Sequence, residues 1–123
     1  MHVLKSDTSS RTPYTKYRSI NGNVSIQDAS KDGKYIVIEN IHRSREEPIG
    51  GWKLKRKIDG KREIVYTFPA DFVLKGGKSV KIWAHGQGGV HSPPESLIFE
   101  DVESFGVGSS VQTVLYNKNG DCG

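Results

Sequence analysis

The segment spanning residues 50–69 constrains the fold more than any other part of this sequence. Its first half, Trp-Lys-Leu-Lys-Arg-Lys-Ile, alternates apolar and basic residues with the period of two that is typical of a β-strand with one buried face. An Asp-Gly dipeptide at positions 59 and 60 then supplies a turn. In the second half, Ile64, Tyr66 and Phe68 again share one face. The segment is therefore predicted to be a long β-hairpin.

The loop length of this hairpin decides which residues face each other. A two-residue loop would place the apolar residues of the second strand opposite lysines, because a slip of one residue moves a whole set of side chains to the other face. A three-residue loop over positions 59–61, with a bulge, instead pairs Trp52 with Phe68 and Leu54 with Tyr66. We expect the second register. It places Arg56 on the buried side, next to Ile64, where only a partner carboxylate or snorkelling of its stem would make the charge tolerable.

The rest of the chain consists of further short strand candidates separated by turn signals. Residues 1–19 are polar and are predicted to be a disordered linker, and residues 20–123 are predicted to form one domain. No segment of useful length has a helical period. The expected fold is an all-β, immunoglobulin-like β-sandwich of about seven to nine short strands, with a small closed barrel as the alternative. The other strand candidates lie at residues 24–26, 34–40, 72–74, 79–84, 97–99 and 111–116.

The apolar positions of the hairpin and of residues 79–84 are the candidate core. No pair of cysteines can bridge the two sheets, so large side chains have to fill the centre of the sandwich. The predicted core residues are Trp52, Leu54, Tyr66, Phe68, Ile82 and Trp83.

Composition limits the class of protein further. The 123 residues suffice for one hydrophobic core, and no apolar run approaches the roughly 20 residues that a membrane-spanning helix needs. The N-terminal residues do not form a signal peptide. The single cysteine, Cys122, excludes an internal disulfide and favours a reducing compartment. The net charge of +4 favours an acidic partner but is modest for a dedicated nucleic-acid-binding domain.

No motif in the sequence predicts catalysis, a cofactor or a metal. The tripeptide Gly77-Lys78-Ser79 lacks the earlier glycine and the following helix of a phosphate-binding loop. His85 and His91 lie in one Gly-rich and Pro-rich loop, yet no second pair of ligands has zinc spacing. No Gly-x-Ser-x-Gly motif frames a nucleophile. We therefore expect a non-enzymatic protein with no cofactor.

The basic side of the hairpin is the candidate binding surface. Alternation places Lys53, Lys55 and Lys57 on one face of their strand, with Lys61 near the turn. The simplest interpretation is a solvent-exposed face that also discourages edge-to-edge pairing. The functional alternative is that these four lysines contact phosphates or an acidic partner.

Four sequence motifs, in this order and spacing, resemble the immunoglobulin-like tail domain of nuclear lamins. They are Gly-Gly-Trp-Lys-Leu-Lys-Arg, Tyr-Thr-Phe-Pro-Ala-Asp-Phe-Val-Leu-Lys-Gly-Gly, Val-Lys-Ile-Trp-Ala-His-Gly and His-Ser-Pro-Pro. The resemblance covers roughly residues 22–120. Phe105 stands where the family would have Trp.

This resemblance implies a structural and interaction domain of an intermediate-filament protein. It implies location in the nucleus, at the lamina of the inner nuclear membrane, with nuclear envelope proteins and chromatin as partners and with no membrane contact by the domain itself. A chromatin-binding or nucleic-acid-binding module and an extracellular adhesion domain are the alternatives. The coiled-coil rod of lamins is not present in this sequence.

Two departures from the family pattern modify these expectations. A basic patch that some A-type relatives use for DNA and partners is replaced here by Thr67 and Asp71, so DNA contact is expected to be weak and to use the lysine face. The sequence also ends before the last strand of the family domain. The exposed edge is expected to be covered by the N-terminal segment or by another molecule. The domain is then a monomer or a weak dimer, and Cys122 is a candidate for an intermolecular disulfide.

Overall fold

The structure is a computed structural model that describes residues 2–7 and 23–121. The described part consists of β-strands, turns and loops, with no helix. Consequently, it contains no helical segment of the length and apolar character needed to span a membrane. Its strands are β1 (His2–Asp7), β2 (Val24–Ala29), β3 (Tyr35–Asn40), β4 (Glu47–Pro48), β5 (Lys53–Ile58), β6 (Arg62–Thr67), β7 (Val73–Leu74), β8 (Ser79–Ala84), β9 (Ser96–Phe99) and β10 (Ser110–Tyr116).

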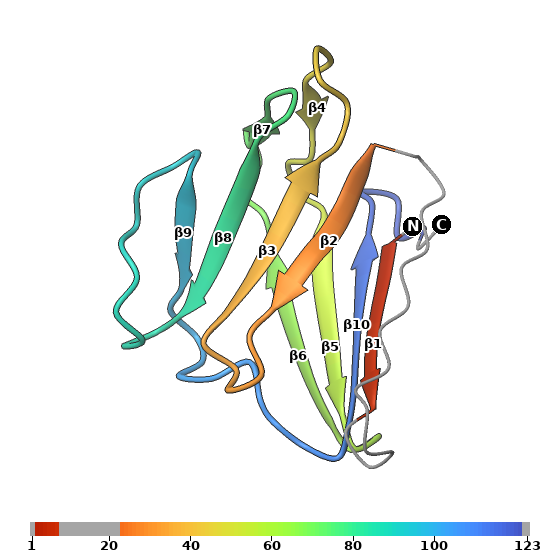
Figure 1. The fold of residues 1–123 in the computed structure, drawn as a ribbon, viewed down its shortest axis with the longest axis vertical. Coiled ribbons are helices and arrows are strands. Elements are labelled where there is room, and N and C mark those ends of the chain that lie inside the picture. The colour runs from red at the N-terminus through yellow and green to blue at the C-terminus, as the bar shows by residue number, and fades with distance from the viewer. Residues whose placement is uncertain (1, 8–22, 122–123) are drawn as a thin grey trace.

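Two four-stranded sheets form the body of the fold and face each other (Figure 1). The first sheet has the order β1-β10-β5-β6, and all of its neighbouring strands are antiparallel. The second has the order β2-β3-β8-β9, in which only β8 and β9 run parallel. The short strands β4 and β7 pair separately at one end. The prediction of an all-β, immunoglobulin-like sandwich is confirmed, and two separate sheets exclude the closed barrel.

The core lies between the two sheets and uses alternate residues of their strands. In β8, for example, Val80, Ile82 and Ala84 are buried while the residues between them are not. This is the pattern of strands that have one face in the core and one face outside. Of the predicted core residues, Leu54, Tyr66, Phe68 and Ile82 belong to the buried cluster, and Trp52 packs against it half-buried.

The predicted register of the long hairpin is confirmed. Leu54 is opposite Tyr66, and the backbone N–H of Phe68 donates to the carbonyl of Trp52 at 2.9 Å. Asp59, in the turn, has a φ of 52°, which is the left-handed region that Asp and Asn tolerate better than most residues.

Strand β1 differs from the prediction that residues 1–19 form only a disordered linker. Its six residues pair antiparallel with β10, from His2 opposite Leu115 to Asp7 opposite Ser110. The edge of β10 supplies main-chain hydrogen-bond partners, and such bonds do not depend on the low apolar content that favoured disorder. The expectation that the N-terminal segment covers this edge agrees with the pairing. The remaining residues of the predicted linker, like Cys122, lie outside the described part of the chain.

Trp83 is the predicted core residue that the structure places elsewhere. It is half-buried on the outer face of β8, and it is not among the residues of the core or those packed against it. Its neighbours Ile82 and Ala84 occupy the inner face, so the alternation of the strand directs the indole outward. The prediction that Trp83 lies in the core is therefore wrong, because the size of a side chain does not determine which face of the strand it occupies.

Candidate interaction surfaces

The lysine face consists of Lys53, Lys55 and Lys57 on the outer side of the first sheet, together with Lys61 in the adjoining loop. The first three alternate with buried residues along β5, so all three point away from the core; Lys53 and Lys57 are exposed and Lys55 is half-buried. Lys61 is exposed in the loop between β5 and β6. The alternation that forms the hairpin thus also places three positive charges in one row on a central strand.

The charges of this face have few neutralising neighbours. Lys57 is the register partner of Glu63, but no ion pair joins them. The Nζ atom of Lys55 lies 4.8 Å from the ring centroid of Tyr116, a cation–π contact that leaves the charge in place. Within residues 23–121, the side-chain ion pairs are Lys34–Asp32 and His85–Glu100, and neither involves the lysine face. The face is therefore suited to an anionic partner.

The outer side of the second sheet carries a different surface, the aromatic face, which consists of Tyr35, Lys81 and Trp83. Tyr35 and Trp83 are register partners on β3 and β8, and their ring centroids are 5.3 Å apart. The Nζ atom of Lys81 lies 4.3 Å from the ring centroid of Tyr35 and 5.2 Å from that of Trp83. Gly89 lies so close to the indole that a Cβ at this position would overlap it. The three side chains and this loop hold one another in place.

Two open hollows flank the aromatic face. One, of about 630 Å³, extends from Tyr35 and Trp83 to the turn between β2 and β3. The other, of about 570 Å³, extends from Tyr35 towards Lys78. Asp28 borders both hollows, next to a break in the register between Ile26 and Asp28. A bulge of this kind in an edge strand commonly re-aims side chains and hinders pairing with another chain.

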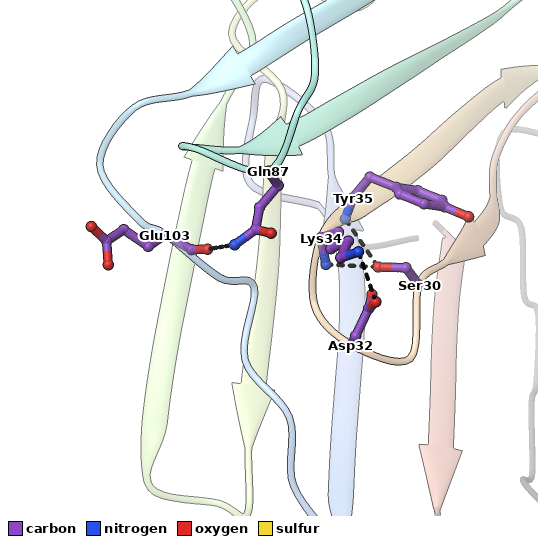
Figure 2. Close-up of polar contacts among 6 residues, drawn as sticks. All are labelled: Ser30, Asp32, Lys34, Tyr35, Gln87 and Glu103. Atoms are coloured by element: carbon purple, nitrogen blue, oxygen red, sulfur yellow. Dashed lines mark hydrogen bonds and ion pairs between the residues drawn. The ribbon is translucent and has the colours of Figure 1, made fainter.

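Polar contacts at the end of the aromatic face are satisfied within the turn and loops (Figure 2). The hydroxyl of Ser30 accepts hydrogen bonds from the backbone N–H groups of Lys34, at 2.7 Å, and Tyr35, at 3.0 Å. The Ser30 side chain also holds the pKa of Asp32 below its usual range. The Nε2 atom of Gln87 donates to the backbone carbonyl of Glu103 at 2.6 Å. These groups fix the local backbone conformation of the turn and the loops.

The two histidines considered as zinc ligands have structural partners. The Nδ1 atom of His85 is 2.8 Å from Oε1 of Glu100, and Nδ1 of His91 accepts from the backbone N–H of Ile98 at 3.2 Å. In the part of the chain that the structure describes, no group of three or more His, Cys, Asp or Glu residues could hold a metal ion.

Sequence reasoning identified the lysine face but missed the aromatic face. The lysines were visible because their alternation lies within one strand. Lys81 and Trp83 are likewise two residues apart in β8, which was an available signal. Their association with Tyr35 depends on the pairing of β3 with β8, and this pairing joins segments that are far apart in the sequence.

The inner face of the hairpin predicts a specific pH dependence of stability. Burial raises the pKa of Tyr66 to about 12, compared with 10.0 for an unperturbed tyrosine. Because the unfolded chain ionises first, the contribution of neutral Tyr66 is fully present below about pH 10 and is lost as the pH rises to about 12. We expect urea denaturation to show a steeper loss of stability over this interval in the wild type than in Tyr66→Phe. Equal slopes would contradict the assignment of this titration to Tyr66.

Comparison with known proteins agrees with the fold and the motifs. The sequence model of the Lamin Tail Domain family matches residues 18–122. A muscle cell intermediate filament protein of Onchocerca volvulus is 68% identical over 121 residues, which are 98% of this chain and 27% of that protein. A muscle cell intermediate filament protein of Acanthocheilonema viteae is also 68% identical, over 98% of this chain and 30% of that protein. Intermediate filament protein A of Ascaris suum is 64% identical, over 98% of this chain and 24% of that protein.

The chain spans less than a third of the length of these relatives. The family match covers strands β2 to β10, and strand β1 lies before it. This chain belongs to the lamin tail domain family, whose matched relatives are named intermediate filament proteins.

Proposed function

We propose that this domain is a non-enzymatic structural and interaction module of an intermediate-filament protein and that its lysine face binds an acidic partner. The observation that carries the proposal is the row formed by Lys53, Lys55 and Lys57 on a central strand, with no ion pair to any of them among the described residues. Family membership supports the structural role. Interaction surfaces built on a stable sandwich need no catalytic groups.

Charge reversal on the lysine face tests this proposal. We expect the triple variant K53E/K55E/K57E to bind a labelled Glu-rich peptide at least about tenfold more weakly than the wild type, a loss of about 1.4 kcal/mol. Fluorescence anisotropy at physiological ionic strength measures the dissociation constants. The three residues face solvent, so the variant should remain folded.

The matched control is K31E/K75E/K78E, which changes the net charge by the same amount at three other exposed lysines. If it weakened binding as much as the first variant, the attraction would come from overall charge and not from the lysine face. Circular dichroism and urea denaturation of both variants check that neither change has disturbed the fold.

Contact with nucleic acid through the same face is the second candidate. It is favoured by the same row of three lysines, which lies on an extended strand with about 6.8 Å between successive members. If each lysine neutralises one phosphate, the logarithm of the affinity for duplex DNA should fall with the logarithm of salt concentration with a slope of about −3. An affinity that does not change with salt would exclude this candidate. The absence of the usual basic patch, with Thr67 and Asp71 in its place, argues for weak binding.

The location of the parent filament is part of the proposal. The resemblance of the sequence motifs to lamins implies location at the nuclear lamina, with chromatin and inner nuclear membrane proteins as partners. Two of the relatives are named muscle cell intermediate filament proteins, and this name favours a filament of muscle cells. We expect an antibody against this chain to stain muscle cells selectively. Staining of the nuclear rim in every cell type would support the lamina instead.

A further inference from the structure

Strand β6 is a regular edge strand of the first sheet. It pairs over all six residues with β5, without a break in register, and is last in the order β1-β10-β5-β6 (Figure 1). The other edges differ from it. Strand β2 has a bulge, β9 is shorter and parallel to its neighbour, and β1 packs beside β2. A regular, unprotected edge is a template for another strand.

The phase of the hydrogen bonds shows which backbone groups of β6 point outward. The N–H of Phe68 donates to Trp52, across the hairpin. Successive N–H groups of a strand point to opposite sides, so those of Tyr66 and Ile64 also point to β5. The N–H and C=O groups of Glu63, Val65 and Thr67 therefore point to the open edge. Within residues 2–7 and 23–121, β6 pairs with no strand other than β5.

The side chains along this edge do little to prevent pairing. Natural edge strands commonly carry Lys, Pro or a bulge for that purpose. The exposed residues of β6 are instead Arg62, Glu63, Val65 and Thr67, with no Lys or Pro within the strand. Val65 is one of the few large hydrophobic residues of the described chain that are exposed, at 38%.

We propose that β6 binds β6 of a second copy of this chain, antiparallel and with the two-fold axis at Val65. The two Val65 residues then form a hydrogen-bonded pair, and Glu63 of each copy pairs with Thr67 of the other. This register uses all the outward N–H and C=O groups of the three residues. The two sheets join into one sheet of eight strands, and the contact is the same on both copies, as two-fold symmetry requires.

Charges on the outer face are compatible with this register. On one side of Glu63, its register partner on β5 is Lys57. On the other side, Glu63 faces Thr67 of the second copy, whose own register partner is Lys53 of that copy. Each Glu63 thus has Lys57 of its own copy as a direct neighbour, whereas Lys53 of the second copy lies two strand spacings away, about 10 Å. The two Lys55 residues are separated by three strand spacings, about 14 Å, which exceeds the Debye length of about 8 Å at physiological salt. An unrelated peptide would need a sequence that suits the exposed side chains of β6. In a second copy, the two-fold axis presents the same strand to itself.

Substitution at the symmetry axis tests the proposal on the full chain. We expect sedimentation equilibrium to show a weak monomer–dimer equilibrium for the wild type, with a dissociation constant below about 1 mM. Val65→Lys places two like charges opposite each other and should weaken the dimer at least about tenfold. The control is Val114→Lys on the same outer face, on β10, which has strands on both sides and should leave the dimer unchanged.

Cross-linking provides a test that does not depend on the effect of an added charge. In a Cys122→Ser background, Val65→Cys places two cysteines at a hydrogen-bonded pair, where Cα atoms are about 5.5 Å apart and a disulfide can form. Oxidation should give a covalent dimer, and Val114→Cys in the same background should not. A wild type that remains monomeric at about 1 mM, a dimer that persists in Val65→Lys, or equal cross-linking of both cysteine variants would overturn the proposal. The result is independent of the lysine-face function.

Discussion

Phe68→Ala should lower the free energy of unfolding by about 3 to 5 kcal/mol, the largest effect that we expect from a single core substitution. The side chain is 2% exposed and lies at the end of the long hairpin. Its ring makes edge contacts with Tyr66, at a centroid distance of 5.2 Å, and with Phe72, at 5.7 Å. The substitution removes both contacts and leaves a cavity that the surrounding strands can fill only in part. Urea denaturation followed by far-UV circular dichroism measures the change.

Trp83→Ala is the comparison for this prediction. The indole is larger than the ring of Phe68, but one side of it faces solvent and its partners lie on the outer face. We expect a loss of about 1 to 2 kcal/mol, because less apolar surface is transferred to water and no closed cavity forms. If the loss matched or exceeded that of Phe68→Ala, the aromatic face would be contributing as much as the core.

The hairpin could be predicted from the sequence because its information is local. Alternation, the Asp-Gly turn and the two possible loop lengths all lie within residues 50–69, and only one register keeps the apolar residues on one side. The lysine face follows from the same alternation. The residues that determine the hairpin register and the lysine face are separated by only a few positions along the chain or by one turn.

Trp83 and β1 could not be predicted in this way because their environments are set by distant strands. The strand β8 has alternating residues, but its sequence does not say which of Ile82 and Trp83 faces the other sheet. That choice depends on β3 and β8 pairing with both inner faces filled by aliphatic residues. Likewise, the polar segment His2–Asp7 becomes a strand because β10 offers an edge. The size or polarity of a single residue therefore does not determine its position in the fold. The pairing of strands in the sheet does.

Arg56 shows how a local pattern is completed by distant groups. The sequence placed it on the buried side of β5, and it is 5% exposed. A carboxylate was a plausible partner, but the guanidinium instead donates through Nε to the carbonyl of Phe105 at 2.7 Å and through Nη1 to the hydroxyl of Thr113 at 3.0 Å. Burial lowers its pKa to about 10, so it remains protonated at neutral pH. The charged end thereby ties the loop before β10 to the hairpin.

Arg56→Ala is expected to destabilise the domain by about 3 kcal/mol, because it removes a packed stem and leaves the carbonyl of Phe105 without its donor. Arg56→Met retains most of the packing and removes a charge that is costly to bury, so its loss of stability should be smaller, about 1 kcal/mol.

Thr113→Val, which removes one hydrogen bond at nearly constant volume, should lower the free energy of unfolding by about 1 kcal/mol. Urea denaturation at pH 7 separates these values, and hydrogen exchange should show faster opening of the loop around Phe105 in both Arg56 variants. If Arg56→Ala were as stable as Arg56→Met, packing of the arginine stem would not be the main contribution of this residue to stability.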